Sequence, residues 1–220
     1  MSTLVYVGAN EGVSLWQIFD QFDDVHVFEP DPEIFEKLSR KYKQFEWVNL
    51  VNAACSNEEG ESSFFITNNR VASSLGCGSE VFQGFGEYNK VVKEITVKTI
   101  NLQKYLEDNG VEEIDLYYSD CQGSDLTVLK TIKEYLNNKK IKEIFTETHG
   151  NGRLLYEGLD NQFDGFKEVL SENYDFVHAS LGCHNGRIVE ENDIPEEDPE
   201  FDSYWRLKDT EPGLGSLLKA

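Results

Sequence analysis

The feature that most constrains the fold of this chain is the alternation of short apolar segments with longer segments of helical periodicity. Candidate strands, rich in Val, Ile, Leu and aromatic residues, occupy 3–8, 25–29, 47–51, 94–99, 114–119 and 141–147. Most of the segments between them repeat apolar residues every three or four positions, as one face of an α-helix does. This alternation predicts an α/β fold with a mostly parallel sheet and helices on both of its faces.

The helices that should cover this sheet are marked by periodicity and by a start signal. Asp31 and Pro32 predict the first residues of one helix, because Asp is a favoured N-cap and Pro is favoured in the first turn. Further helices are expected at 13–22, 101–108, 124–137 and 162–173.

Two segments, 67–92 and the acidic part of 190–220, lack this regularity. Residues 67–92 are rich in Asn, Ser and Gly, and we expect a mobile loop over the site, since long loops in compact domains are usually functional or mobile. Residues 175–181 and 185–189 predict a closing antiparallel hairpin. The segment 190–220 is acidic at its start, and its first part, 190–202, is expected to be a solvated tail or loop. We expect 1–220 to form a single domain.

The composition limits the partners of the chain. The 220 residues carry a formal net charge of −21. Such acidity disfavours a nucleic-acid backbone or an anionic membrane as the main partner, because both are negatively charged. No apolar stretch approaches the roughly 20 residues that span a bilayer, and the N-terminus does not resemble a signal peptide. We therefore expect a cytoplasmic protein without a membrane span.

A glycine turn follows the first strand, in Val5–Gly12, VYVGANEG. Its G-x-x-x-G spacing differs from the G-x-G-x-x-G of dinucleotide sites and from the P-loop, which also needs a lysine. The turn therefore matches neither of these nucleotide-binding sequences. It still allows a small ligand to approach the end of the strand closely.

Glu29 ends the second strand, 21 positions after Gly8. An acid at this place can accept hydrogen bonds from ribose hydroxyls. A ribose diol beside a turn that lacks the pyrophosphate glycines fits S-adenosylmethionine better than NAD. The alternative for Glu29 alone is an acid that merely precedes the helix at Pro32.

Five segments in a fixed order resemble one family. With these segments the chain is similar to the FkbM-type family of class I S-adenosylmethionine-dependent methyltransferases, over about the first two thirds of its length. The segments are VGANEG at 7–12, FEPDP at 28–32, NAACS at 52–56, SSL at 73–75 and IDLYYSDCQGSDLTVLK at 114–130.

This resemblance implies a Rossmann-like, seven-stranded sheet, bound S-adenosylmethionine and methyl transfer, commonly to oxygen. It implies that Glu29 holds the ribose and that Ala53 borders the adenine. The other implied cofactor residues are Gly8, Asn10 and Gly12 at the methionine part and Ser74 near the cofactor.

Two residues depart from the family. Tyr6 stands where an acid usually precedes VGAN, and that acid would contact the ammonium group of the cofactor. Tyr118 stands where the family usually has a lysine, while the aspartate of the same segment is retained as Asp120.

Methyl transfer to a hydroxyl requires a base or a metal that lowers the pKa of the alcohol. Asp120, Glu147 and His149 follow neighbouring strands, and two carboxylates with an imidazole could ligate Mg²⁺ or Mn²⁺. A metal-free alternative makes His149 the base and Asp120 the residue that orients it. Asp120 could instead cap the next helix, and the other two could be ordinary strand-end residues. His184 is a lower-ranked base.

The sequence therefore predicts an O-methyltransferase that acts on a hydroxyl of a sugar, in a glycan or a glycosylated metabolite. A 6-deoxyhexose such as rhamnose is an example. A protein, a lipid or another small molecule is the alternative acceptor. A binding module that keeps the fold without catalysis is the second alternative. No feature indicates the oligomeric state.

Overall fold

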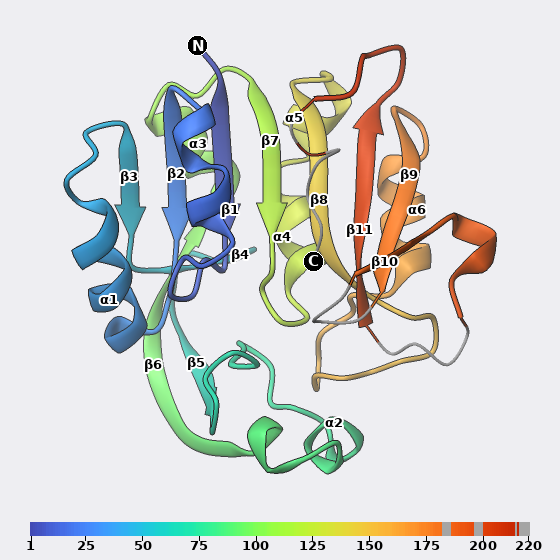
Figure 1. Ribbon diagram of the computed structural model, residues 1–220. Coiled ribbons are helices and arrows are strands. Elements are labelled where there is room, and N and C mark those ends of the chain that lie inside the picture. Colours follow the sequence, from blue (N-terminus) through green and yellow to red (C-terminus); the bar gives the residue numbers. More distant parts are fainter. Residues whose placement is uncertain (182–185, 196–199, 214, 216–220) are drawn as a thin grey trace.

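The computed structural model describes residues 1–181, 186–195, 200–213 and 215, and its main element is a sheet of eight strands (Figure 1). The strand order is β10-β9-β11-β8-β7-β1-β2-β3. Strands β3, β2, β1, β7 and β8 are parallel neighbours, whereas β11 is antiparallel to both β8 and β9. The strands are β1 (Thr3–Val7), β2 (Asp24–Phe28), β3 (Val48–Val51), β7 (Ile114–Ser119), β8 (Ile141–His149), β9 (Tyr174–Leu181), β10 (Arg187–Val189) and β11 (Glu200–Leu207).

A smaller sheet of order β4-β6-β5 lies beyond the carboxyl ends of the parallel strands, together with α2 (Figure 1). Its elements are β4 (Ala54–Ser56), β5 (Gly60–Thr67) and β6 (Val91–Asn101), and α2 spans Glu80–Gly84. This sheet therefore forms a cover over the edge where the polar strand ends meet.

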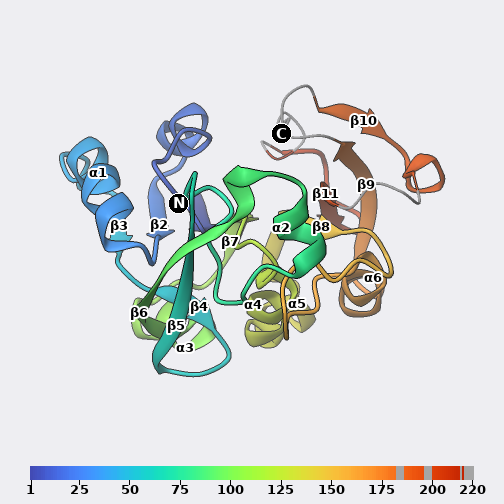
Figure 2. The same cartoon turned by 90° about the horizontal axis from the view of Figure 1, so that it is seen from below.

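The helices are distributed unequally over the two faces of the large sheet (Figure 2). One face carries α3 (Leu102–Asp108), α4 (Asp125–Thr131), α5 (Lys133–Asn137) and α6 (Phe163–Leu170). The other face carries α1 (Pro32–Tyr42) and the 3-10 turns η1 (Leu15–Gln17) and η2 (Phe19–Gln21), near β1–β3. Among the described helices none covers β8, β11 and β9 on that second face. The remaining 3-10 turns are η3 (Glu87–Asn89) and η4 (Glu191–Asp193).

The core divides along the same two faces, because alternate strand residues point to opposite sides of a sheet. Tyr117 and Ile144 pack in the cluster that contains the apolar residues of α3–α6. Their neighbours Tyr118 and Phe145 pack in the second cluster, which contains residues of α1, η1 and η2. Both faces of the central strands are thus buried, as a parallel sheet requires.

The predicted start of α1 is confirmed. Asp31 accepts a hydrogen bond from the backbone N–H of Glu33 at 2.9 Å, and Pro32 is the first helical residue. Two other helix predictions were inaccurate. The segment 13–22 forms only η1 and η2, with Val13 and Trp16 70% and 56% exposed, so its apolar spacing does not describe one buried face.

The helix expected at 124–137 is interrupted. It is divided into α4 and α5 at Ile132, whose ψ of 31° lies outside the helical range. Both parts still bury their apolar residues against the sheet.

The predicted fold class is confirmed, but the count of seven strands was wrong. The expected hairpin is present as β9 and β10, which pair antiparallel and lie at one edge of the sheet. The strand that was missed is β11, which lies between β8 and β9. The sequence predicted a solvated segment through residue 202, whereas Phe201 is 3% exposed. Strand β11 was missed because it lies in an acidic segment and because its partners, β8 and β9, are distant in the sequence.

The segment 67–92 is also more regular than expected. It contains the end of β5, the helix α2, the turn η3 and the start of β6. It lies on the side of the molecule that faces the carboxyl ends of the strands, where a cover over the site was predicted (Figure 1).

Candidate functional site

A cavity opens at the carboxyl ends of β1, β2 and β7, where the strand order reverses at β1. Such a reversal is where ligands bind in open α/β sheets. Gly8, Asn10, Glu29, Ala53 and Asp120 line this cavity. Four of the six predicted cofactor residues and one predicted catalytic residue therefore share one cavity.

The turn after β1 needs glycine at position 8. Gly8 has a φ of +78°, and a Cβ atom there would lie 1.9 Å from the carbonyl oxygen of Asp120. The backbones that follow β1 and β7 can approach this closely only because Gly8 has no side chain. The close approach shapes the floor of the cavity.

Glu29 is held in place by the backbone. Its Oε2 accepts from the N–H of Asn10 at 2.8 Å, and its Oε1 accepts from the N–H of Asp31 at 2.7 Å. The residue is 5% exposed, and burial raises the pKa of its carboxyl to about 7, although the two backbone hydrogen bonds oppose this rise. A carboxylate oxygen accepts more than one hydrogen bond, so both oxygens retain capacity for ligand hydroxyls.

Gly12 and Ser74 have structural contacts instead. A Cβ on Gly12 would meet the side chains of Tyr42 and Leu38, so this glycine allows the turn to pack against α1. The hydroxyl of Ser74 donates to the carbonyl of Gln122 at 2.6 Å, which attaches the segment after β5 to the turn after β7. Neither residue lines the cavity.

Arg70 closes one side of the cavity. It donates to Asp31 and to Glu33, both at 2.6 Å, and thereby joins the segment after β5 to the start of α1. Arg70, Val71 and Ser73 line the cavity. The predicted cover over the site is thus attached through an ion pair to the helix that follows Glu29.

Tyr6 and Tyr118, the two departures from the family pattern, contact each other. They occupy paired positions on β1 and β7, and their rings stack with centroids 4.2 Å apart. Burial raises the pKa of both phenols well above the usual value, so both remain neutral. The acid and the lysine that the family resemblance implies at these two positions would be register partners, so the two departures concern one pair of neighbours.

Asp120 has an environment suited to proton transfer. Its Oδ1 accepts from Nε2 of Gln122 at 2.7 Å. Burial and the charge of Asp125 raise the pKa of Asp120 to about 6. A carboxylate with this pKa is charged at neutral pH and accepts protons more readily than an exposed aspartate.

Glu147 and His149 lie on β8 outside the cavity lining. The Nε2 of His149 and the Oε1 of Glu147 are 3.7 Å apart, and both residues are at most 2% exposed. Burial lowers the pKa of His149 to about 4 and raises that of Glu147 well above its usual value. His149 is thus a weaker proton acceptor than Asp120.

The sequence grouped Asp120 with these two residues as metal ligands, but the structure groups them differently. The donor atoms of Glu147, His149 and Glu200 all lie within 4.8 Å of one another, and Asp120 is not part of this group. Glu200 was missed because it was assigned to a solvated segment. His184 lies outside the described residues.

Gln122 and Tyr156 were also missed. The hydroxyl of Tyr156 donates to Oε1 of Gln122 at 2.7 Å, and its ring stacks on His149 with centroids 5.9 Å apart. The two residues therefore connect Asp120 with the group on β8. Gln122 lies inside the segment that resembles the family, but nothing in the sequence marked Tyr156.

The cavity fits S-adenosylmethionine on its own chemistry. The carboxylate of Glu29 suits a ribose diol, the turn at Gly8 leaves space at the end of β1, and Ala53 and Phe64 offer apolar surface for a base. Among the described lining residues Arg70 is the one cation, and its guanidinium is already bound to Asp31 and Glu33, which is consistent with a ligand that lacks phosphate.

A comparison with protein families decides the assignment. The methyltransferase FkbM domain matches residues 7–202. The chain belongs to this family.

One curated relative is the 2-O-methyltransferase NoeI of Sinorhizobium fredii. It is 29% identical to this chain over 137 residues, which cover 60% of the chain and 55% of NoeI. The chain thus spans about half the length of this relative.

Solved structures with a similar fold include an rRNA methylase from Streptococcus thermophilus, with 10% identity and a TM-score of 0.48 over 94% of this chain and 86% of that one. Another is the N-methyltransferase NodS from Bradyrhizobium japonicum in complex with S-adenosyl-L-homocysteine, with 8% identity and a TM-score of 0.45 over 94% and 78% of the two chains. None of the helices described in this chain has the length and apolar character to cross a membrane.

Proposed function

We propose that this chain is an S-adenosylmethionine-dependent O-methyltransferase whose acceptor is a hydroxyl of a sugar, in a glycan or a glycosylated metabolite. The observation that carries the proposal is the position of Asp120. Its carboxylate lies in the wall of the cavity that Glu29 and Gly8 also line, and its pKa is raised to about 6. A proton acceptor therefore stands beside the cofactor residues.

The chain's residues have separate tasks in this reaction. S-adenosylmethionine supplies an electrophilic methyl group. Glu29 binds the ribose hydroxyls, and the turn at Gly8 positions the methionine part. Asp120 accepts the proton of the acceptor hydroxyl as the oxygen attacks, and Gln122 holds the carboxylate of Asp120 in place through the 2.7 Å hydrogen bond. Alignment of the two reactants supplies much of the rate enhancement.

Two observations support a hydroxyl of a sugar as the acceptor. The name of NoeI, a 2-O-methyltransferase with which the chain shares 29% identity, supports an oxygen atom as the acceptor. In addition, three carboxylates follow or lie on three adjacent strands: Asp120 comes directly after β7, Glu147 is on β8 and Asp202 is on β11. Carboxylates accept hydrogen bonds from several hydroxyls at once, as a polyol provides.

The experiment is an acceptor survey with S-adenosylmethionine labelled in its methyl group. We expect label in sugars with free hydroxyls, including rhamnosides, and little in peptides or lipids without sugar. Asp120→Asn should lower the rate at least about 100-fold, the contribution expected of a general base. Asp175→Asn, which changes an exposed aspartate on β9, is the matched control.

Two outcomes would contradict the proposal. Label in a peptide or lipid would keep the methyltransferase but replace its acceptor. If S-adenosylhomocysteine did not bind at all, the chain would instead be a non-catalytic module with this fold.

A further inference from the structure

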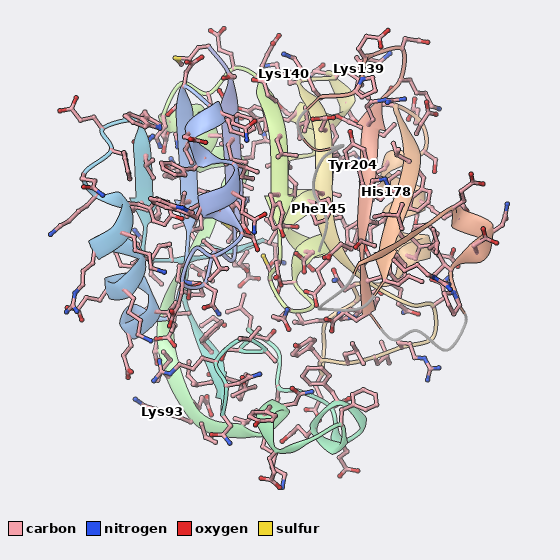
Figure 3. The ribbon with its side chains drawn as sticks, viewed as in Figure 1. Lys93, Lys139, Lys140, Phe145, His178 and Tyr204 are labelled. Carbon is pink, nitrogen blue, oxygen red and sulfur yellow. The ribbon has the colours of Figure 1, made fainter. Side chains whose placement is uncertain are left out.

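One face of the large sheet carries a row of aromatic side chains on five adjacent strands. Tyr6, Tyr118, Phe145 and Tyr204 are successive partners on β1, β7, β8 and β11, and His178 pairs with Tyr204 on β9. Figure 3 shows Phe145, Tyr204 and His178 on this face. Because alternate residues share a face, the residues two positions further along each strand must lie beside this row.

Those next positions are acidic on the three central strands. Asp120 follows Tyr118 by two positions, Glu147 follows Phe145, and Asp202 is the register partner of Glu147. One step further, His149 pairs with Glu200. The sheet therefore gathers four carboxylates and an imidazole where β7 and β8 end and β11 begins.

The charges of three members of this group are not balanced by a lysine or arginine among the described residues. Asp120, Glu147 and Asp202 form no ion pair with a lysine or arginine in the part of the chain that the structure describes. Like charges held together in a buried site require protons or a cation.

Two buried atoms within the group indicate a cation. The Oε1 of Glu147 and the Nε2 of His149 are fully buried and have no hydrogen-bond partner among the described residues. They are 3.7 Å apart, and a carboxylate oxygen of Glu200 lies within 4.8 Å of both. Buried polar atoms are rarely left without a partner, and here three possible ligand atoms lie within 4.8 Å of one another.

We propose that Glu147, His149 and Glu200 bind one divalent transition-metal ion, with Mn²⁺ favoured over Mg²⁺. Imidazole is a ligand of transition metals, whereas Mg²⁺ prefers oxygen ligands and retains its water. Two donors that bind one ion at about 2.1 Å each are at most about 4.2 Å apart. The group therefore has to contract by several tenths of an ångström when the ion binds.

A proton shared between Glu147 and His149 is the competing explanation. It would balance one charge, but it would leave Glu200 and Asp202 close to the same buried carboxylate. A divalent ion balances two charges and provides a ligand for both of the buried atoms that lack one. The metal explanation therefore accounts for more of the observed group.

The position of the site also suggests its use, which rests on the proposed function. Three protein ligands leave coordination positions open for oxygen atoms of the acceptor. The ring of Tyr156 lies against His149, and its hydroxyl contacts Gln122, which holds Asp120. The ion would thus hold the acceptor beside the carboxylate that takes its proton.

The test measures Mn²⁺ binding by electron paramagnetic resonance, with the full chain after EDTA dialysis and with neither cofactor nor acceptor present. We expect one Mn²⁺ per chain, and Mg²⁺ should compete only at about tenfold or more higher concentration. Glu147→Gln, His149→Ala and Glu200→Gln should each weaken Mn²⁺ binding at least about tenfold. Asp120→Asn and the exposed control Glu112→Gln should bind Mn²⁺ like the unmodified chain.

Circular dichroism of each variant checks its fold, and a variant that fails to fold is replaced by Glu147→Asp or His149→Gln, for which the same weakening is expected. The proposal is overturned if the unmodified chain binds no stoichiometric Mn²⁺, or if the three ligand variants retain it. Loss of Mn²⁺ in Asp120→Asn would overturn the assigned ligand set. Because no methyl transfer is measured, failure of the metal site and failure of the proposed function are distinguishable.

Discussion

At the scale of single residues, the environment of Glu29 makes ligand binding depend on pH. The buried carboxyl has a pKa of about 7 and accepts two backbone hydrogen bonds. Ribose hydroxyls donate hydrogen bonds and therefore favour the ionised form. Ligand binding must then be coupled to the loss of a proton from Glu29.

We expect the affinity for S-adenosylhomocysteine to rise with pH up to about 7 and then to level off. The folded pKa is raised, so Glu29 is neutral below pH 7, and the affinity should fall by up to about tenfold per pH unit there. In Glu29→Gln the affinity should be lower and independent of pH. Calorimetric titrations between pH 5.5 and 8.5 test this, with the exposed Glu46→Gln as control; a pH-independent affinity in the unmodified chain would contradict it.

Gly8 allows a second prediction at this scale. Gly8→Ala places a Cβ atom 1.9 Å from the Asp120 carbonyl oxygen at a φ of +78°. The left-handed conformation and the overlap together should lower the free energy of unfolding by about 2–5 kcal/mol. Urea denaturation measures this loss. Gly84→Ala is the control because a Cβ there meets nothing within 4 Å, and equal stability of the two variants would be inconsistent with the described turn.

At the scale of elements, the segment after β5 and the start of α1 close the cavity together. The link between them is Arg70, which joins Asp31 and Glu33. Asp31 is buried and caps α1, so its charge is screened by solvent less than that of an exposed acid. This ion pair should therefore affect ligand binding as well as local structure.

Arg70→Ala should raise the dissociation constant for S-adenosylhomocysteine by about tenfold, because the wall of the cavity loses its attachment to α1. Arg40→Ala, which removes an exposed pair with Glu36 on the same helix, should leave it unchanged. Isothermal titration calorimetry compares the two variants. An unchanged affinity in Arg70→Ala would show that the ion pair does not hold the wall in place.

The same elements show what the sequence could predict. Strand β1, the turn at Gly8, the N-cap Asp31 and the end of β7 were predictable, since each depends on residues close together in the chain. Strand β11 was not predictable, because its burial depends on pairing with distant strands. Its partners on β8 are more than fifty residues away, and its partners on β9 are 20 to 33 residues away. Glu200 was missed for the same reason, and so the predicted ligand set contained Asp120, whereas the proposed set contains Glu200.

At the scale of the whole molecule, a bound metal would stabilise the folded chain. An ion that binds only the folded state contributes about 2.7 kcal/mol at one hundred times its dissociation constant. For a chain of this size that corresponds to a rise in Tm of roughly 5–10 °C. The proposed ligands lie on β8 and β11, which are interior strands of the large sheet. The ion should therefore stabilise the whole chain against unfolding.

We therefore expect Mn²⁺ to raise the Tm of the EDTA-treated chain by about 5–10 °C at one hundred times its dissociation constant. The same addition should raise the Tm of Glu200→Gln by at most about half as much, because binding that is tenfold weaker contributes only about 1.4 kcal/mol at this concentration. Differential scanning calorimetry measures both. An equal rise in the Tm of the two proteins would indicate that Mn²⁺ binds elsewhere on this acidic chain.

The most direct test of the account as a whole is a crystal structure of the chain with S-adenosylhomocysteine. The account predicts the ligand in the cavity at the ends of β1, β2 and β7, with its ribose hydroxyls on the carboxylate of Glu29 and its sulfur on the side of Asp120. A ligand bound elsewhere, or a ribose that does not contact Glu29, would contradict it.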